Sequence, residues 1–166
     1  SGMLNLGNTC FLNSVMQILS HTYELNDFLS QKTYIPRLNK KVDSVLLLEW
    51  DKLRTDLWDQ NKTVSPINFI KTVHKISRLK GLDTFSGFTQ NDTSEFLLFI
   101  IDCFHTAISR EVIMQIHGSP QMETDNMAIK CYEVIKQMYE KDYSELFQIF
   151  YGTHISMIRD VNDNLM

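Results

Sequence analysis

Residues that interrupt helices are scarce in this chain. Its 166 residues include only three prolines and six glycines, and both residue types are disfavoured inside α-helices. Apolar residues also recur at helical spacing through most of the sequence. The sequence therefore predicts a mainly α fold with a short β part at its C-terminal end. The expected helices begin at about Cys10 and then cover residues 21–30, 43–60, 66–77 after a Ser65 cap, 92–105, 126–141 and, as a short helix or turn, 144–150.

Two segments in the C-terminal third alternate apolar and polar residues, which is typical of strands. We expect a short strand and turn within residues 108–121 and a strand over residues 150–159. The helix over residues 43–60 carries a wide apolar face, made of Val45, Leu46, Leu48, Leu53, Leu57 and Trp58. We expect the tryptophans of this helix, Trp50 and Trp58, in the core.

One cysteine lies where a turn runs into an amphipathic helix. Asn5, Gly7, Asn8 and Thr9 favour turns and helix caps, and apolar residues follow Cys10 at helical spacing. A thiol in the first helical turn faces unpaired backbone N–H groups and the positive end of the helix dipole, which favour the thiolate. Cys10 is therefore a candidate nucleophile, and the Asn5 amide is a candidate donor to an oxyanion. The alternative is a packed, inert cysteine.

A second informative stretch runs over residues 87–105. Asn91 or Asp92 can open a helix there, and Glu95 follows Asp92 by three residues in the capping-box arrangement. By chemistry alone, Asp92 and Glu95 are helix caps rather than ligand contacts. Cys103 and Cys131 lie among apolar residues, so we expect both to be packing residues.

Composition limits the class of partner. The net charge is −4 and the isoelectric point is about 5.7, which argues against nucleic acid and anionic membranes as main partners. No apolar run approaches the roughly 20 residues of a membrane span, and no secretory leader is evident. Three widely spaced cysteines suit a reducing interior rather than a disulfide framework. We expect an intracellular protein, cytoplasmic or nuclear, that is monomeric.

The fourteen-residue run LNLGNTCFLNSVMQ, residues 4–17, resembles the cysteine box of the ubiquitin-specific proteases. These are papain-like α+β thiol hydrolases that cut after the C-terminal glycine of ubiquitin. The resemblance implies that Cys10 is the nucleophile, and that the Asn5 side chain and the Cys10 backbone N–H hold the oxyanion. Ubiquitin or ubiquitinated proteins would then be both substrate and partner.

Residues 90–96 resemble the second box of the same family, with Asn91 and Thr93 departing from its commonest residues. In the family this box lines the channel for the extended ubiquitin tail and places an aspartate near the tail's arginines. The resemblance thus implies that Asp92, and more weakly Gln90 and Glu95, bind the tail. The Cys10 helix and the Asp92 helix should then pack as two walls of one channel.

The resemblance also implies parts that this sequence lacks. A cysteine hydrolase needs a histidine base, and none of the five histidines, His21, His74, His105, His117 and His154, has the family's surroundings. No Cys-x-x-Cys pair is present, so we expect no zinc and no other cofactor. We expect residues 1–149 to be the helical thumb of a longer protease and residues 150–166 the first strand of its fingers. The alternative is a non-catalytic module that binds the ubiquitin tail or regulates another protein.

Overall fold

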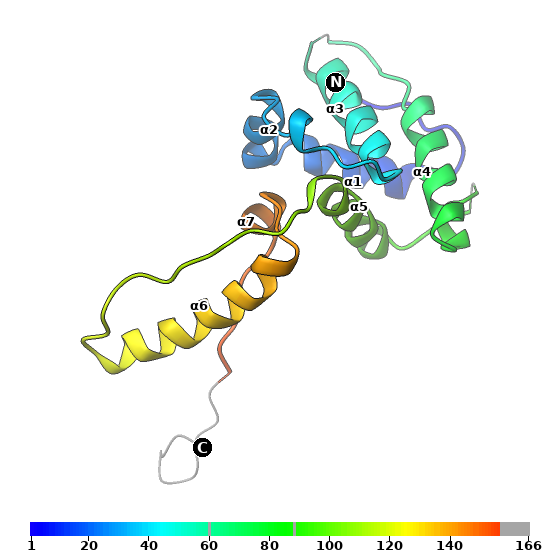
Figure 1. Cartoon of the computed structure of the whole chain (residues 1–166). Coiled ribbons are helices and arrows are strands. Elements are labelled where there is room, and N and C mark those ends of the chain that lie inside the picture. The colour runs from blue at the N-terminus through cyan, green and yellow to red at the C-terminus, as the bar shows by residue number, and fades with distance from the viewer. Residues whose placement is uncertain (60, 88, 157–166) are drawn as a thin grey trace. The chain divides into compact units, whose positions relative to one another are not determined.

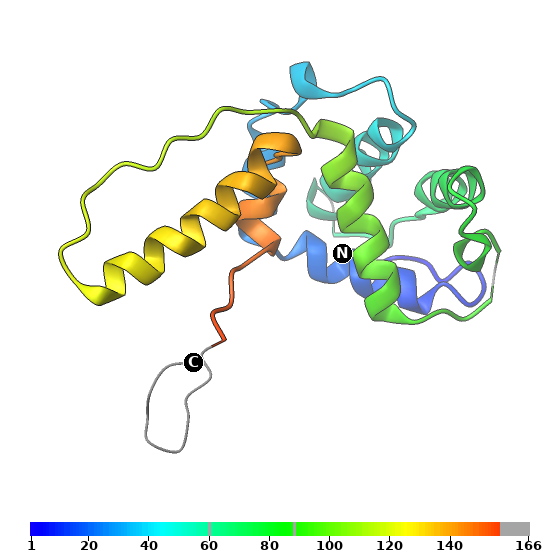
Figure 2. The ribbon, with the colours of Figure 1, turned by 60° about the horizontal axis from the view of Figure 1, so that its bottom comes forward.

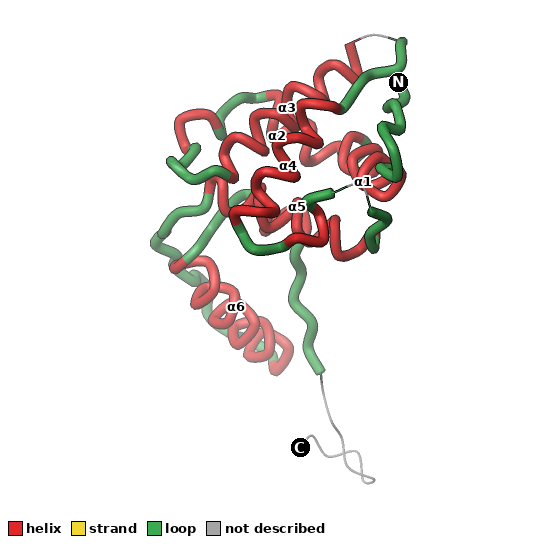
Figure 3. The backbone as a smooth tube through the Cα atoms, turned by 90° about the vertical axis from the view of Figure 1, so that its right-hand side faces the viewer, coloured by secondary structure: helices red, strands yellow, loops and turns green. Residues whose placement is uncertain are grey.

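The computed structural model describes residues 1–59, 61–87 and 89–156 of the chain. Within these ranges the regular structure is helical apart from two isolated β-bridges (Figure 3), so the predicted mainly α fold is confirmed. The chain divides into two compact units, residues 1–109 and residues 110–166. The assignment of residues 1–149 to a thumb and 150–166 to fingers stays a prediction.

Helices build the first unit, as far as it is described. They are α1 (Cys10–Ser20), α2 (Tyr23–Ser30), α3 (Asp43–Asp59), α4 (Ile67–Leu79) and α5 (Thr93–Ile108), with the short 3₁₀ helices η1 (Ile35–Arg37) and η2 (Asp83–Phe85). Helix α3 packs against α4 and α5, and α1 packs against α5 and α2 (Figures 1 and 2). These helices match the predicted ones. Pro66, however, is the N-cap residue of α4 and not its first helical residue, because its ψ of 21° lies outside the helical range.

Trp50 joins three helices at the centre of the first unit. Its fully buried ring on α3 stacks on Phe104 of α5, with 6.4 Å between ring centroids, and lies 6.1 Å from Phe69 of α4. The prediction of a core position is wrong for Trp58, which is 53% exposed. The Trp58 indole lies at the end of α1, where its Nε1 donates to the Ser20 carbonyl at 3.1 Å.

The buried face of α3 agrees only in part with the predicted apolar face, since Leu46, Leu53 and Leu57 are buried as predicted. Val45 and Leu48 are exposed, whereas the polar residues Asp51 and Arg54 are buried. The Asp51 carboxylate accepts hydrogen bonds from the Tyr34 hydroxyl at 2.5 Å and from Arg54 Nη2 at 2.7 Å, and it pairs with Lys32. This network joins the segment after α2 to α3, and three donors compensate the buried charge of Asp51.

The pKa of the Asp51 carboxyl follows from the same network. Burial by itself raises that pKa, but the hydrogen bonds from Lys32, Tyr34 and Arg54 outweigh burial, and the pKa lies below its ordinary value. The pKa of Tyr34 is raised, first by burial and then by its hydrogen bond to Asp51. Asp51 is therefore ionised and Tyr34 neutral at physiological pH.

The N-terminal residues are anchored to the loop before α4. The Leu4 N–H donates to the Val64 carbonyl at 2.9 Å, and the Val64 N–H donates to the Gly2 carbonyl at 2.8 Å. From α1, Asn13 Nδ2 donates to the Leu4 carbonyl at 3.1 Å and Gln17 Nε2 to the Ser1 carbonyl at 2.9 Å. The segment that leads to Cys10 is thus held from two sides.

The second unit contains α6 (Glu123–Lys141) and α7 (Leu146–Phe150) in its described part. Arg110 forms a single antiparallel bridge with Tyr143 and a two-pronged ion pair with Glu145, at 2.7 and 3.1 Å. The Tyr139 ring stacks on Phe147 with 5.2 Å between centroids. These contacts join the start of the unit and α6 to the region of α7. Both predicted helices are confirmed.

The strand predicted within residues 108–121 is wrong. Helix α5 runs to Ile108, and the described chain after the Arg110 bridge has no partner strand. Its polar groups bond to α6 instead: the Val112 N–H donates to the Glu140 carbonyl and the Met114 N–H to the Glu140 carboxylate. Residues 151–156 form no ladder either, and the rest of the strand predicted over 150–159 lies outside the described residues.

Candidate active site

Cys10 is the first residue of α1, and its side chain is exposed. The first bond of the helix runs from the Asn13 N–H to the Thr9 carbonyl at 2.9 Å. The N–H groups of Cys10, Phe11 and Leu12 therefore have no acceptor within the helix. These open donors give the first turn of α1, which carries the thiol, a positive partial charge.

The loop before Cys10 is closed by the side chain of Asn5. Asn5 Oδ1 accepts hydrogen bonds from the Gly7 N–H at 3.1 Å, the Thr9 N–H at 3.2 Å and the Thr9 hydroxyl at 3.1 Å. The backbone reverses through Gly7 and Asn8, which have φ angles of 102° and 51°. Glycine adopts the first angle without the clash that a Cβ would cause, so the sharp turn predicted at Gly7 is present.

Asp92 caps α5. Its Oδ1 accepts a hydrogen bond from the Glu95 N–H at 2.9 Å, which confirms the capping role expected from the spacing of the two residues. Both side chains are exposed. Gln90 lies two residues before the cap and is exposed as well.

Helices α1 and α5 meet directly behind these residues. The Phe11 ring lies edge-on to the Phe96 ring, with 5.1 Å between centroids. In front of this contact an open pocket of about 240 Å³ is lined from both helices, by Cys10, Phe11 and Ser14 on one side and Gln90, Asn91 and Thr93 on the other. Cys10 and Gln90 thus share one pocket, whereas Asn5, Asp92 and Glu95 are not among its lining residues.

The match to known proteins covers nearly the whole chain. The family model described as ubiquitin carboxyl-terminal hydrolase matches residues 1–164. The chain belongs to the ubiquitin carboxyl-terminal hydrolase family, within the ubiquitin-specific proteases. The resemblance of the cysteine box is thereby confirmed.

Curated relatives agree with this assignment. The chain is 30% identical over 161 residues to ubiquitin carboxyl-terminal hydrolase 2 of Bos taurus, covering 92% of this chain and 25% of the relative. Over 156 residues it is 30% identical to the Homo sapiens protein of that name, with the same coverage. Over 112 residues it is 38% identical to ubiquitin carboxyl-terminal hydrolase Usp2 of Drosophila melanogaster, covering 67% of this chain and 11% of the relative. The chain spans about a quarter of the length of the first two relatives.

Four residues that line the pocket are not among the site residues expected from the sequence, and Ser14 and Thr93 are two of them. Ser14 lies one helical turn after Cys10, so the i, i+4 spacing was the available signal. Thr93 opens α5 directly after the Asp92 cap. The packing of α1 against α5 determines which residues line the pocket, so neither residue could be assigned to the pocket from the sequence alone.

None of the five histidines lines the Cys10 pocket. His21, His117 and His154 are exposed, and His105 is buried on α5. His74 is partly buried on α4; burial, and then the nearby Arg78 charge, lower its pKa despite a hydrogen bond to the Gly87 backbone. A base that acts on a thiol must lie within hydrogen-bond reach of it, and none of these histidines is placed in the described pocket beside the Cys10 thiol.

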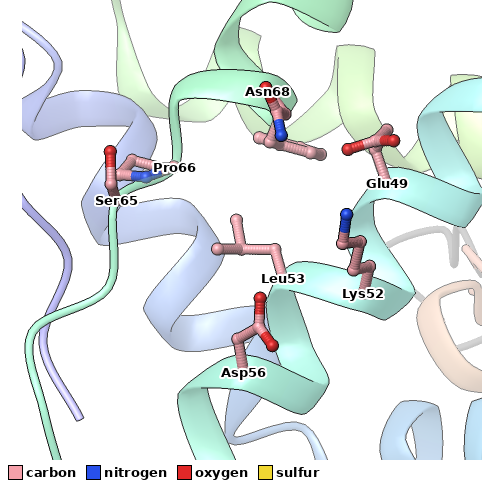
Figure 4. A pocket seen from close by; sticks show the side chains of 8 residues that line it. Glu49, Lys52, Leu53, Asp56, Ser65, Pro66 and Asn68 are labelled. Carbon is pink, nitrogen blue, oxygen red and sulfur yellow. The ribbon is translucent and has the colours of Figure 1, made fainter.

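Another cavity of the first unit is too small for a polypeptide substrate. It lies between α3 and the start of α4, where Leu53 and Asp56 face Ser65, Pro66 and Asn68 (Figure 4). Its volume is about 40 Å³, close to the roughly 30 Å³ that one water occupies in the liquid. Among the described residues, no group of three or more His, Cys, Asp or Glu side chains is placed to hold a metal ion. No described helix is both long and apolar enough to cross a membrane.

Proposed function

We propose that this chain provides the nucleophile of a deubiquitinase, which hydrolyses isopeptide or peptide bonds at the C-terminal glycine of ubiquitin. The observation that carries the proposal is the pocket in which exposed Cys10 meets Gln90 and its neighbours at the start of α5. Family membership supports the same chemistry.

The proposed reaction starts at the Cys10 sulfur. The thiolate attacks the glycine carbonyl carbon, and the Asn5 amide together with the Cys10 N–H stabilises the resulting oxyanion. Collapse of this intermediate breaks the C–N bond, and the leaving amine takes a proton from the conjugate acid of the base. Water then hydrolyses the thioester. The base is a residue outside those that line the described pocket.

The size and polarity of the pocket suit a glycine-ended tail. A pocket of about 240 Å³ lies below the roughly 300–1,000 Å³ of typical small-molecule sites, and glycine brings no side chain into it. The exposed Asp92 carboxylate lies two residues from Gln90, where it can pair with an arginine of the extended tail. We therefore assign Gln90, Asp92 and Glu95 to tail binding, with Gln90 nearest to Cys10.

A specific observation favours a second candidate, a module that binds the ubiquitin tail without cutting it. No histidine lines the pocket, so recognition and turnover are separable in this chain.

The three cysteines are all free, which supports the expected reducing, intracellular compartment for either candidate.

The test is the intact mass of the 166-residue chain after incubation with ubiquitin that carries an electrophile at its C-terminus. We expect one adduct, and we expect it to vanish in Cys10→Ser and to persist in the matched variants Cys103→Ser and Cys131→Ser. Adduct without turnover of a ubiquitin substrate supports the binding module. A folded chain that forms no adduct overturns the proposal.

A further inference from the structure

Thr9 occupies the N-cap position of α1 but does not cap the helix. A threonine at this position usually accepts a hydrogen bond from an N–H group of the first turn, a contact worth about 1 kcal/mol. Here the Thr9 side chain makes no such bond. Its hydroxyl turns back to the preceding loop, where it accepts from the Leu6 N–H at 3.1 Å and donates to Asn5 Oδ1 at 3.1 Å.

The hydrogen bonds at Asn5 fix which way its amide points. Two backbone N–H groups, from Gly7 and Thr9, converge on the same side-chain atom. Because an N–H group can bond only to an acceptor, that atom is the oxygen. The amino group Nδ2 therefore lies on the other side of the amide, and it donates to no described residue. The Asn5 side chain itself is exposed.

Thr9 is buried, at 3% exposure, although a buried hydroxyl is costly unless both its donor and acceptor functions are used. Both are used here, and both serve the loop. The same arrangement leaves the N–H groups of Cys10, Phe11 and Leu12 without a side-chain cap. The Thr9 hydroxyl thus has two effects: it donates a hydrogen bond to Asn5 Oδ1, and it leaves the N–H groups in the first turn of α1 without a side-chain acceptor.

We propose that Thr9 is a positioning residue for the oxyanion site, acting through Asn5: its hydroxyl forgoes the cap of α1 and fixes the Asn5 amide with Nδ2 turned outward as a donor. This inference rests on the proposed role of Asn5 and names a further residue on which that role depends.

The first test needs no ubiquitin. Side-chain amide NMR of the 166-residue chain compares Asn5 in the unmodified protein, in Thr9→Val, which has the same shape without the hydroxyl, and in Thr9→Ser, which restores the hydroxyl. We expect the heteronuclear NOE of the Asn5 NH₂ group to be that of an ordered amide in the unmodified chain and in Thr9→Ser, and to fall in Thr9→Val. Equal NOE values in all three proteins overturn the proposal.

The second test separates the oxyanion site from thiol access. Ubiquitin with a C-terminal aldehyde reacts reversibly: an S–C bond forms, the thiol proton passes to the aldehyde oxygen, and that oxygen occupies the oxyanion site. Ubiquitin with a C-terminal alkyl bromide reacts by displacement: the thiol proton is lost to solvent, an S–C bond forms, and bromide leaves with the electron pair of the C–Br bond, so no oxyanion arises.

We expect Asn5→Ala to weaken aldehyde binding by about 100-fold or more, as for loss of one oxyanion donor, and Thr9→Val to weaken it by about 10-fold. Thr9→Ser should restore it, and alkylation rates should stay within about 2-fold. The double variant should bind the aldehyde no more weakly than Asn5→Ala, because Thr9 acts through Asn5. Parallel losses for both reagents in Thr9→Val, or additive losses in the double variant, overturn the proposal.

Failure of the proposed function has a different outcome. An unmodified chain that reacts with neither ubiquitin reagent overturns the deubiquitinase assignment. The NMR comparison then still decides whether Thr9 positions Asn5.

Discussion

The Phe11 ring, on the residue next to the candidate nucleophile, stands edge-on to the ring of Phe96 at 5.1 Å and 88°. Phe96 in turn contacts Phe85 of η2 at 5.4 Å and Phe99 at 6.2 Å. All four rings are buried. This aromatic cluster links the helix that carries Cys10 to the helix that Asp92 caps, so the two walls of the pocket pack against the same buried rings.

Substitution of Phe96 should therefore affect both stability and reactivity. We expect Phe96→Ala to lower the free energy of unfolding by about 3–5 kcal/mol, and to slow the reaction of Cys10 with ubiquitin electrophiles even where the protein is still folded. Urea denaturation followed by circular dichroism measures the first effect. Leu98→Ala is the matched control: Leu98 lies on the same helix but is 66% exposed, so its change should stay within about 0.5 kcal/mol. Similar losses for both variants would show that the cluster has no special role.

Asp92 has a structural and a proposed binding role, and three substitutions separate them. Asp92→Ala removes the cap of α5 and should lower the free energy of unfolding by about 1 kcal/mol. A residue that only bound ubiquitin would leave that free energy unchanged. Asp92→Asn and Asp92→Ser keep a capping oxygen but lose the charge. We expect all three to weaken binding of ubiquitin by roughly 10- to 100-fold, since a hydrogen bond to a charged group is worth about 1.5–3 kcal/mol. Titration calorimetry with ubiquitin checks this. Unchanged affinity in Asp92→Asn would remove Asp92 from the tail site.

The Asp51 network predicts a definite pH dependence of stability. Because the pKa of Asp51 is lower in the folded protein than its ordinary value, the stabilisation is complete above the ordinary aspartate pKa of about 3.9. It is lost as the pH falls through the lower, folded-state pKa. We expect Asp51→Asn to cost about 3–5 kcal/mol at pH 7, because Arg54 then stays buried without its counter-charge.

Urea denaturation midpoints between pH 7 and pH 2 measure this dependence. The difference between the unmodified chain and Asp51→Asn should be constant down to about pH 4 and should shrink below it. Asp59→Asn, at the exposed end of the same helix, should track the unmodified chain throughout. A difference that grows on acidification would contradict the assigned sign.

The cysteines should differ sharply in reactivity. Cys10 is exposed, whereas Cys103 on α5 is fully buried. Burial raises the pKa of the Cys103 thiol, and the neighbouring Asp43 raises it further although Lys80 opposes this. Iodoacetamide at pH 8 should therefore label Cys10 in the native protein and leave Cys103 unmodified until urea unfolds the chain, because the thiolate is the reactive form. Peptide mass mapping against time reads both rates. Labelling of native Cys103 at the rate of Cys10 would refute the prediction.

Local signals in the sequence were sufficient for the helices and for some of the residues at their ends. The Cys10 helix start followed from the turn formers before it, and the Asp92 cap from the position of Glu95. Such features depend on bonds within a few residues. The same reasoning failed for Trp58 and Leu48, because the apolar face of α3 was read without knowing that Asp51 would be buried against Lys32 and Tyr34.

Features that depend on contacts between residues far apart in the sequence could not be predicted from local sequence patterns. Alternation after Ile108 predicted a strand, but the described segment bonds to Glu140 of α6 and has no partner strand. The cysteine box identified Cys10 and Asn5 as candidates. It did not place Ser14 or Thr93 at the pocket, because that depends on the packing of Phe11 against Phe96.

The pairing of the N-terminal residues with Val64 has a consequence for how the protein matures. The residues before Cys10 are synthesised earlier than their anchor, residue 64, which follows α1, α2 and α3 in the chain. Closing this long-range contact carries an entropic cost that those helices must first offset by packing. The loop of Asn5 and Thr9 therefore forms late, and a nascent chain lacks the hydrogen bonds of this loop beside Cys10 until the unit has folded.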